Sequence, residues 1–126
     1  MMPPQRVRHH TDDAGLEKIR ARGAIMAGRG WGNIAAGVNV EVEPFGTTRP
    51  STPGRPGPKA DLGCAGEGAY VEFDAPPQLV ATANVGPRNT GLIPLLAGQL
   101  FSLHGVNPVY VKVRLHWWQF WRTRAR

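Results

Sequence analysis

Cysteine is nearly absent from this chain, and so is any stretch that could cross a membrane. Cys64 is the single cysteine, so an internal disulfide is impossible and we expect action inside a cell. No apolar run is long enough to span a bilayer, and the first residues lack the apolar core of a signal peptide. We therefore expect no membrane partner, and delivery into another compartment would depend on something else.

Several catalytic signatures are missing too. His9 and His10 are adjacent, so they point to opposite faces of a strand and cannot hold one ion together. The sequence contains no Walker loop, no glycine-rich dinucleotide motif after a strand and no nucleophile elbow. We therefore expect no metal site, no phosphate loop and no serine-hydrolase chemistry.

Glycine and proline, in contrast, are abundant, with 16 and 12 copies in 126 residues. That composition predicts a turn-rich α+β domain rather than a helical bundle. The net charge of +6 suits a partner rich in phosphate, such as RNA, or an acidic protein.

The chain is expected to form one domain over residues 7–126, preceded by a linker at 1–6. A helix is predicted at 12–22, where aspartates suit the first turn and Gly23 suits the end. Residues 44–66 hold five prolines, so we expect a mobile loop without repetitive structure. Residues 86–91 read as a turn. Strands are predicted at 7–11, 24–26, 37–42, 66–74, 79–82 and 108–115.

The strand predicted at 66–74 carries three candidate functional residues. Alternation places Tyr70, Glu72 and Asp74 on one face, with Val71 and Phe73 facing the core. The plainer interpretation is an edge strand with a solvated acidic face.

In the strand at 108–115, the odd-numbered valines are expected to face the core.

A carboxylate that faces a cleft can stabilise an oxocarbenium-like transition state during glycosidic cleavage. The bond between nicotinamide and ribose in NAD is glycosidic, and nicotinamide leaves as a neutral molecule, so no strong general acid is needed. A histidine beside a ribose can exchange hydrogen bonds with its hydroxyls.

Three stretches carry a family resemblance. Residues 7–11 and the helix pattern that follows resemble the opening of small bacterial ADP-ribosyltransferase toxin domains, in which a His-x-Thr strand end precedes such a helix. Residues 37–40 resemble their second motif, and residues 69–74 their acidic strand. The chain resembles the ADP-ribosyltransferase domain with the HYD1 signature, found at the C-terminal ends of Rhs-type polymorphic toxins and type VI secretion effectors.

The resemblance implies an ADP-ribosyltransferase-like core, a split and bent antiparallel sheet with one or two short helices. NAD, as a substrate, would lie in the cleft between the strand of His9 and the strand of Glu72. It implies that His9 contacts the NAD ribose and that Thr11 supports it, with Arg8 as an alternative anchor. Glu72 or Asp74 takes the role of catalytic acid, and Tyr70 stacks on nicotinamide. The sequence departs from the family pattern at Asn39, where many members have Tyr, and at the Glu-x-Asp pair, so the choice between the two carboxylates stays open.

The function predicted is an NAD-dependent mono-ADP-ribosyltransferase toxin, delivered into the cytoplasm of a competing cell. Its acceptor is RNA or protein, and a cognate immunity protein is expected to cover the cleft. Alternatives are an NAD glycohydrolase, a ribonuclease with His9 or His10 as general base, and an RNA-binding module that uses the aromatic residues at 116–122.

Overall fold

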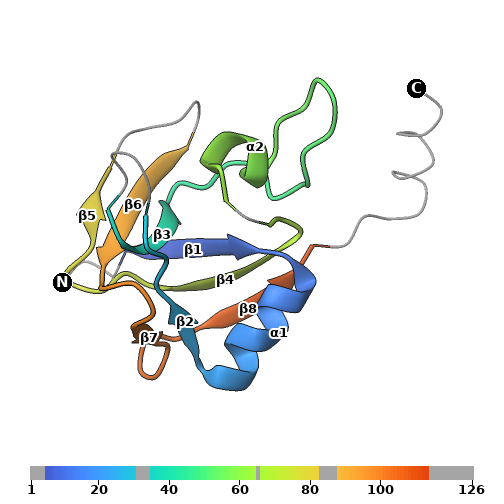
Figure 1. Cartoon of the computed structure of the whole chain (residues 1–126). Coiled ribbons are helices and arrows are strands. Elements are labelled where there is room, and N and C mark those ends of the chain that lie inside the picture. Colours follow the sequence, from blue (N-terminus) through green and yellow to red (C-terminus); the bar gives the residue numbers. More distant parts are fainter. Residues whose placement is uncertain (1–4, 31–34, 65, 83–87, 114–126) are drawn as a thin grey trace.

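The fold comes from a computed structural model, which describes residues 5–30, 35–64, 66–82 and 88–113 (Figure 1). The start of the predicted linker and the aromatic residues at 116–122 lie outside these residues. The elements run in the order β1 (Arg6–Thr11), α1 (Asp13–Arg22), β2 (Ala24–Met26), β3 (Gly37–Val42), α2 (Pro58–Leu62), β4 (Ala69–Asp74), β5 (Val80–Ala81), β6 (Asn89–Pro94), β7 (Leu100–Ser102) and β8 (Val109–Lys112).

Two antiparallel sheets form the framework. Six strands pair in the order β5-β6-β3-β1-β4-β8, and β2 pairs with β7 in a separate sheet. Every pair of neighbouring strands in the six-stranded sheet is antiparallel. The prediction of a mixed α+β domain with an antiparallel sheet and one or two short helices is confirmed, and the structure has two.

Helix α1 begins and ends where the sequence indicates. The Asp12 carboxylate accepts a hydrogen bond from the Gly15 N–H at 2.7 Å, which caps the first turn. Gly23 ends the helix in the left-handed conformation, with φ of 69°, and its N–H bonds to the Ile19 carbonyl. Leu16 and Ile19 are buried on the helix face that meets the sheet.

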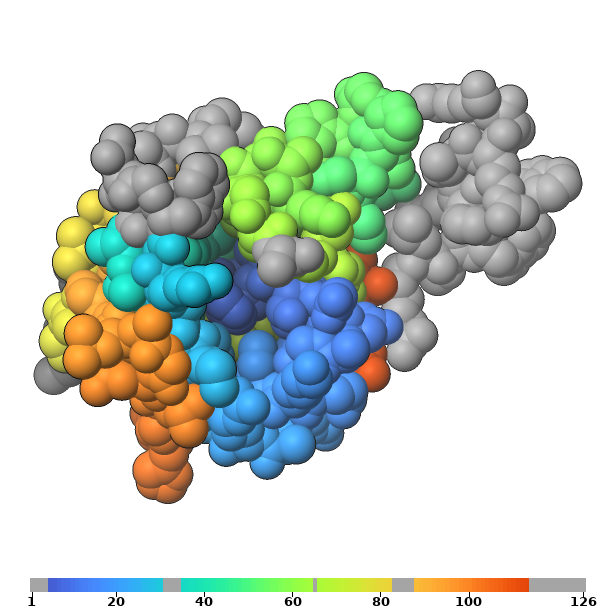
Figure 2. Space-filling view, viewed as in Figure 1, coloured from blue at the N-terminus to red at the C-terminus, as the bar shows by residue number. Residues whose placement is uncertain are grey.

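The six-stranded sheet has one apolar face and one polar face. The apolar face packs on α1 and on the β2–β7 sheet, which lie on the same side in Figure 1. Buried side chains of this core include Val7, Val38, Val40, Val42, Val71, Phe73, Ile93 and Phe101. Residues 44–63, the covering segment, lie over the part of the polar face that carries Arg8 and Glu41, and Glu72 stays partly exposed. The green surface of this segment lies above the blue surface of α1 in Figure 2.

The covering segment differs from its prediction, because it contains α2. Pro58 occupies the first turn of this short helix, and Gly63 ends it in the left-handed conformation with φ of 66°. Both are ordinary helix boundary signals. The five prolines of residues 44–66 favoured a prediction of loop without repetitive structure, although these two boundary signals were present.

Two further predictions are wrong. Residues 89–91 belong to β6 and not to a turn, because pairing with β3 from Val42 to Gly37 holds Asn89 and Gly91 extended. In β8, Tyr110 packs against the core, whereas Val109 is half exposed. The register pairs Val109 with Glu72, which places the odd-numbered valines on the polar face. Strand β7 was not anticipated.

Among the described residues, no helix is both long and apolar enough to cross a membrane.

Candidate functional site

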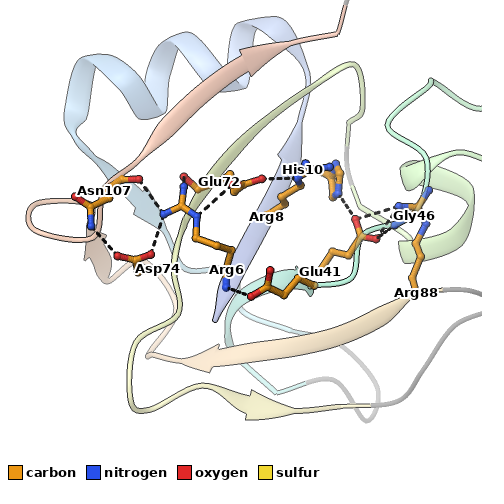
Figure 3. Close-up of polar contacts among 10 residues, drawn as sticks. Arg6, Arg8, His10, Glu41, Gly46, Glu72, Asp74, Arg88 and Asn107 are labelled. Carbon is orange, nitrogen blue, oxygen red and sulfur yellow. Dashed lines mark hydrogen bonds and ion pairs between the residues drawn. The ribbon is translucent and has the colours of Figure 1, made fainter. Parts of the chain in front are cut away.

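Strands β1 and β4 bring most of the predicted polar residues onto one face. Their register pairs Arg6 with Asp74, Arg8 with Glu72 and His10 with Tyr70. Directly opposed residues of an antiparallel pair project to the same side of the sheet. Figure 3 shows the resulting polar row from Asn107 to Arg88. Because the two strands are hydrogen-bonded neighbours, the cleft expected between them does not exist, and the polar face is the candidate surface.

Glu72 lies at the centre of this row between two arginines. Its Oε1 accepts a hydrogen bond from Arg8 Nε at 2.9 Å, and its Oε2 accepts one from Arg6 Nε at 3.2 Å. The Glu72 side chain is 23% exposed, so the carboxylate remains within reach of solvent. One carboxylate therefore holds two guanidinium groups at a partly open surface.

Asp74 completes the acidic side of the row. Arg6 Nη1 donates to Asp74 Oδ1 at 2.9 Å, and Asn107 Nδ2 donates to Asp74 Oδ2 at 2.7 Å. Arg6 Nη1 also donates to the Asn107 carbonyl at 3.1 Å. Asp74 therefore orients Arg6, and Arg6 in turn contacts Glu72.

Both carboxyls are held in the ionised form. Desolvation acts to raise the pKa of Glu72, but the hydrogen bonds from Arg8 and Arg6 outweigh it and lower that pKa. The hydrogen bonds from Arg6 and Asn107 lower the pKa of Asp74. Neither group is suited to donate a proton near neutral pH, and each can stabilise a developing positive charge.

Two aromatic rings flank Arg8. Its guanidinium carbon lies 3.9 Å from the centre of the Phe45 ring and 4.4 Å from the centre of the Tyr70 ring. Tyr70 was a sequence candidate. Phe45 was missed, because nothing in the pattern of a proline-rich loop indicates that this ring returns to the sheet.

His9 and Thr11 lie on the other face. The register pairs them with the buried residues Val71 and Ala69. The His9 Nδ1–H donates to the Asn39 backbone carbonyl at 2.9 Å, and desolvation lowers the pKa of His9. The structure therefore brings His9 and Thr11 together but separates both from Glu72. The Asn39 side chain is exposed and is two residues from Glu41, on the polar side of β3.

A second, buried cluster adjoins the row and was not anticipated. Glu41 and Arg88 both have side chains that are 0% exposed, and Arg88 Nη1 donates to Glu41 Oε1 at 3.0 Å. His10 Nε2 donates to the same Glu41 oxygen at 2.7 Å. Arg88 also donates to Asp61 Oδ2 and to the Thr47 carbonyl, at 2.7 and 2.6 Å.

This buried cluster attaches the covering segment to the sheet. Gly46 N–H donates to Glu41 Oε2 at 2.7 Å, next to Phe45, which contacts Arg8. Burial tends to raise the pKa of Glu41, but hydrogen bonds from His10 and Gly46 and the charge of Arg88 lower it. Glu41 lies on the polar side of β3, and the covering segment explains its burial.

No group of three metal-ligating side chains occurs among the residues that the structure describes. Comparison with protein-family models, with curated proteins and with solved structures finds no match for this chain.

Acidification should weaken the polar row. The pKa values of Glu72 and Asp74 in the folded protein lie below their ordinary values of 4.5 and 3.8. Their stabilisation is therefore present above those values and is lost as the pH falls through the lower folded-state values. We expect the urea midpoint to fall between pH 6 and pH 3, and to fall less in Asp74→Asn. If the urea midpoint falls equally in the wild type and in Asp74→Asn, then Arg6 does not hold Asp74 in its ionised form.

Proposed function

We propose that this chain is an NAD-dependent mono-ADP-ribosyltransferase toxin domain with an ADP-ribosyltransferase-like fold. One observation carries the proposal: the ionised, partly exposed Glu72 carboxylate accepts hydrogen bonds from two guanidinium groups, one of which lies on the Tyr70 ring of the same sheet face. The sequence resemblance supports the same activity, and the two antiparallel sheets are compatible with the split sheet that it implies.

The roles follow from charge and position. Glu72 stabilises the positive charge that develops on the ribose as the bond to nicotinamide breaks. Arg6 and Arg8 supply positive charge for the pyrophosphate of NAD. Tyr70 offers a ring on which nicotinamide can stack. Nicotinamide leaves as a neutral molecule, so the low pKa of Glu72 is compatible with the reaction.

We propose that Asp74 is a positioning residue, because its carboxylate accepts a hydrogen bond from Arg6 and so orients that guanidinium group. His9 and Thr11 face away from Glu72, so the proposed site does not include them. Of the two carboxylates, we therefore propose Glu72 as the catalytic one.

The biological setting is proposed from the resemblance. The domain would be delivered into the cytoplasm of a competing cell, where it would modify RNA or protein. A cognate immunity protein would cover the polar face in the producing cell.

The test is incubation of the purified chain with NAD labelled in the adenylate part, in a bacterial lysate. We expect nicotinamide release and label on a macromolecule. Loss of the label with RNase identifies an RNA acceptor, and loss with protease identifies a protein. Free ADP-ribose alone would favour the glycohydrolase. Intact NAD would exclude both NAD-dependent activities, and RNA cleavage without added NAD would favour the ribonuclease.

A further inference from the structure

The excess positive charge of the described chain is concentrated in one place. Residues 44–60 contain Arg49, Arg55 and Lys59 and no Asp or Glu, whereas the rest of the described chain has eight Lys and Arg against nine Asp and Glu. All three basic side chains belong to residues 49–59, the basic projection, whose loop extends beside α2 in Figure 1 and whose last two residues begin that helix. The described surface is therefore close to neutral apart from this projection.

The basic projection is closed both within its loop and at its base. Thr52 and Arg55 exchange two backbone hydrogen bonds of 3.0 Å, which forms a narrow turn. A Cβ on Gly57 would lie 2.2 Å from the Arg49 carbonyl oxygen, so the two ends of the loop are in contact. Four prolines in this stretch restrict the unfolded chain and so reduce the entropy lost on folding.

One carboxylate fixes the projection to the domain. Glu67 accepts hydrogen bonds from the Ser51 N–H at 2.7 Å, from the Ser51 hydroxyl at 2.9 Å and from the Lys59 N–H at 2.9 Å. The Ser51 hydroxyl oxygen accepts from the Gly57 N–H at 2.9 Å. These contacts occupy both oxygens of the Glu67 carboxylate with Ser51 and with the Lys59 backbone.

The three basic residues are exposed, and none forms an ion pair with another described residue. Between them the projection offers Pro, Ser, Thr and Gly, with no large apolar side chain. A protein partner usually needs a desolvated apolar or aromatic anchor, which this surface lacks. Contacts with phosphate need only positive charge and hydrogen-bond donors.

We propose that the basic projection binds the phosphate backbone of a nucleic acid. The contact is independent of base sequence, because the described projection has no aromatic ring or amide that could recognise a base. The same covering segment seats Phe45 over Arg8, so a bound strand would lie beside the polar face. That this strand is the acceptor of ADP-ribose depends on the proposed function, whereas the binding itself does not.

The test is fluorescence anisotropy with labelled 20-nucleotide RNA and DNA, without NAD, from 50 to 200 mM salt. In the full chain, a variant with Arg49→Gln, Arg55→Gln and Lys59→Gln should lose about tenfold or more in affinity at low salt. Its slope of log affinity against log salt should fall by about 2, at roughly 0.7 for each lost contact with a single strand. A preference for RNA over DNA would indicate that ribose hydroxyls contribute, and equal binding would indicate recognition of phosphate alone.

The matched control removes the same charge from another exposed surface, with Lys18→Gln, Arg20→Gln and Arg22→Gln on α1. We expect this variant to stay within about twofold of the wild type. If both triple variants lose affinity equally, the loss comes from net charge alone and the proposal is overturned. Displacement of RNA by polyglutamate of matched charge would overturn it too, in favour of an acidic protein partner.

Failure of the proposed function is distinguishable from failure of this inference. Glu72→Gln should bind nucleic acid as the wild type does, because Glu72 is not part of the projection. Binding without NAD cleavage would refute the enzyme assignment alone. NAD cleavage without binding would refute the projection alone.

Discussion

Glu72→Gln is expected to lower NAD cleavage by roughly 100-fold or more, which corresponds to about 2.7 kcal/mol of transition-state stabilisation. The amide keeps the shape of the side chain, and its one oxygen can still accept a hydrogen bond from one of the two arginines. It lacks the negative charge that would stabilise the oxocarbenium-like ribose. Nicotinamide release under saturating NAD measures the change in kcat, and a matched urea titration shows that the variant is folded.

Two companion variants sharpen this result. Glu17→Gln removes an exposed carboxylate of α1, which is paired with Lys112 at 2.8 Å, and should leave the rate unchanged. Asp74→Asn keeps Glu72 but weakens the orientation of Arg6, so a loss of only a few-fold is expected. A wild-type rate in Glu72→Gln together with a large loss in Asp74→Asn would transfer the catalytic role to Asp74. Wild-type rates in both variants would remove the carboxylates from the mechanism.

Arg88→Met should cause the largest loss of stability. The Arg88 side chain is fully buried, and its removal leaves Glu41 as a buried carboxylate without its arginine. Asp61 and the Thr47 carbonyl also lose their donor. Breaking a buried ion pair from one side costs about 3–5 kcal/mol, because the remaining charge stays desolvated. The free energy of unfolding in urea, at neutral pH, measures the effect.

The control for this variant is Arg22→Met, which changes the same residue type at an exposed position of α1 and should shift stability by less than about 0.5 kcal/mol. Combining Arg88→Met with Glu41→Gln removes both charges, so the double variant should recover part of the loss. The difference from additivity gives the coupling of the two residues. If Arg88→Met lies within about 1 kcal/mol of the wild type, the cluster is not desolvated in solution.

Local features of the fold could be predicted from the sequence because short-range chemistry decides them. Asp12 and Gly23 set the limits of α1 through capping and left-handed geometry, whatever the helix packs on. Alternation in 69–74 assigned Val71 and Phe73 to the core and Glu72 to the opposite face. These assignments needed only the period of a strand.

Predictions that required knowledge of strand partners were less successful. Asn89 and Gly91 have turn chemistry, but β3 on one side and β5 on the other make them part of a strand. The valines of β8 resemble core residues by composition, yet the register with β4 places Val109 opposite Glu72. Hydrophobicity alone could not reveal which face of an edge strand meets the core.

The candidate site divides in the same way. The sequence by itself determined that Tyr70, Glu72 and Asp74 share a face, because a strand fixes side-chain direction every second residue. Only the tertiary structure decided that Arg6 and Arg8 pair with these carboxylates, because that depends on the register of β1 against β4. It likewise separated His9 from Glu72 and buried Arg88 with Glu41. Contacts between residues distant in sequence depend on how the chain packs, which local sequence patterns do not reveal.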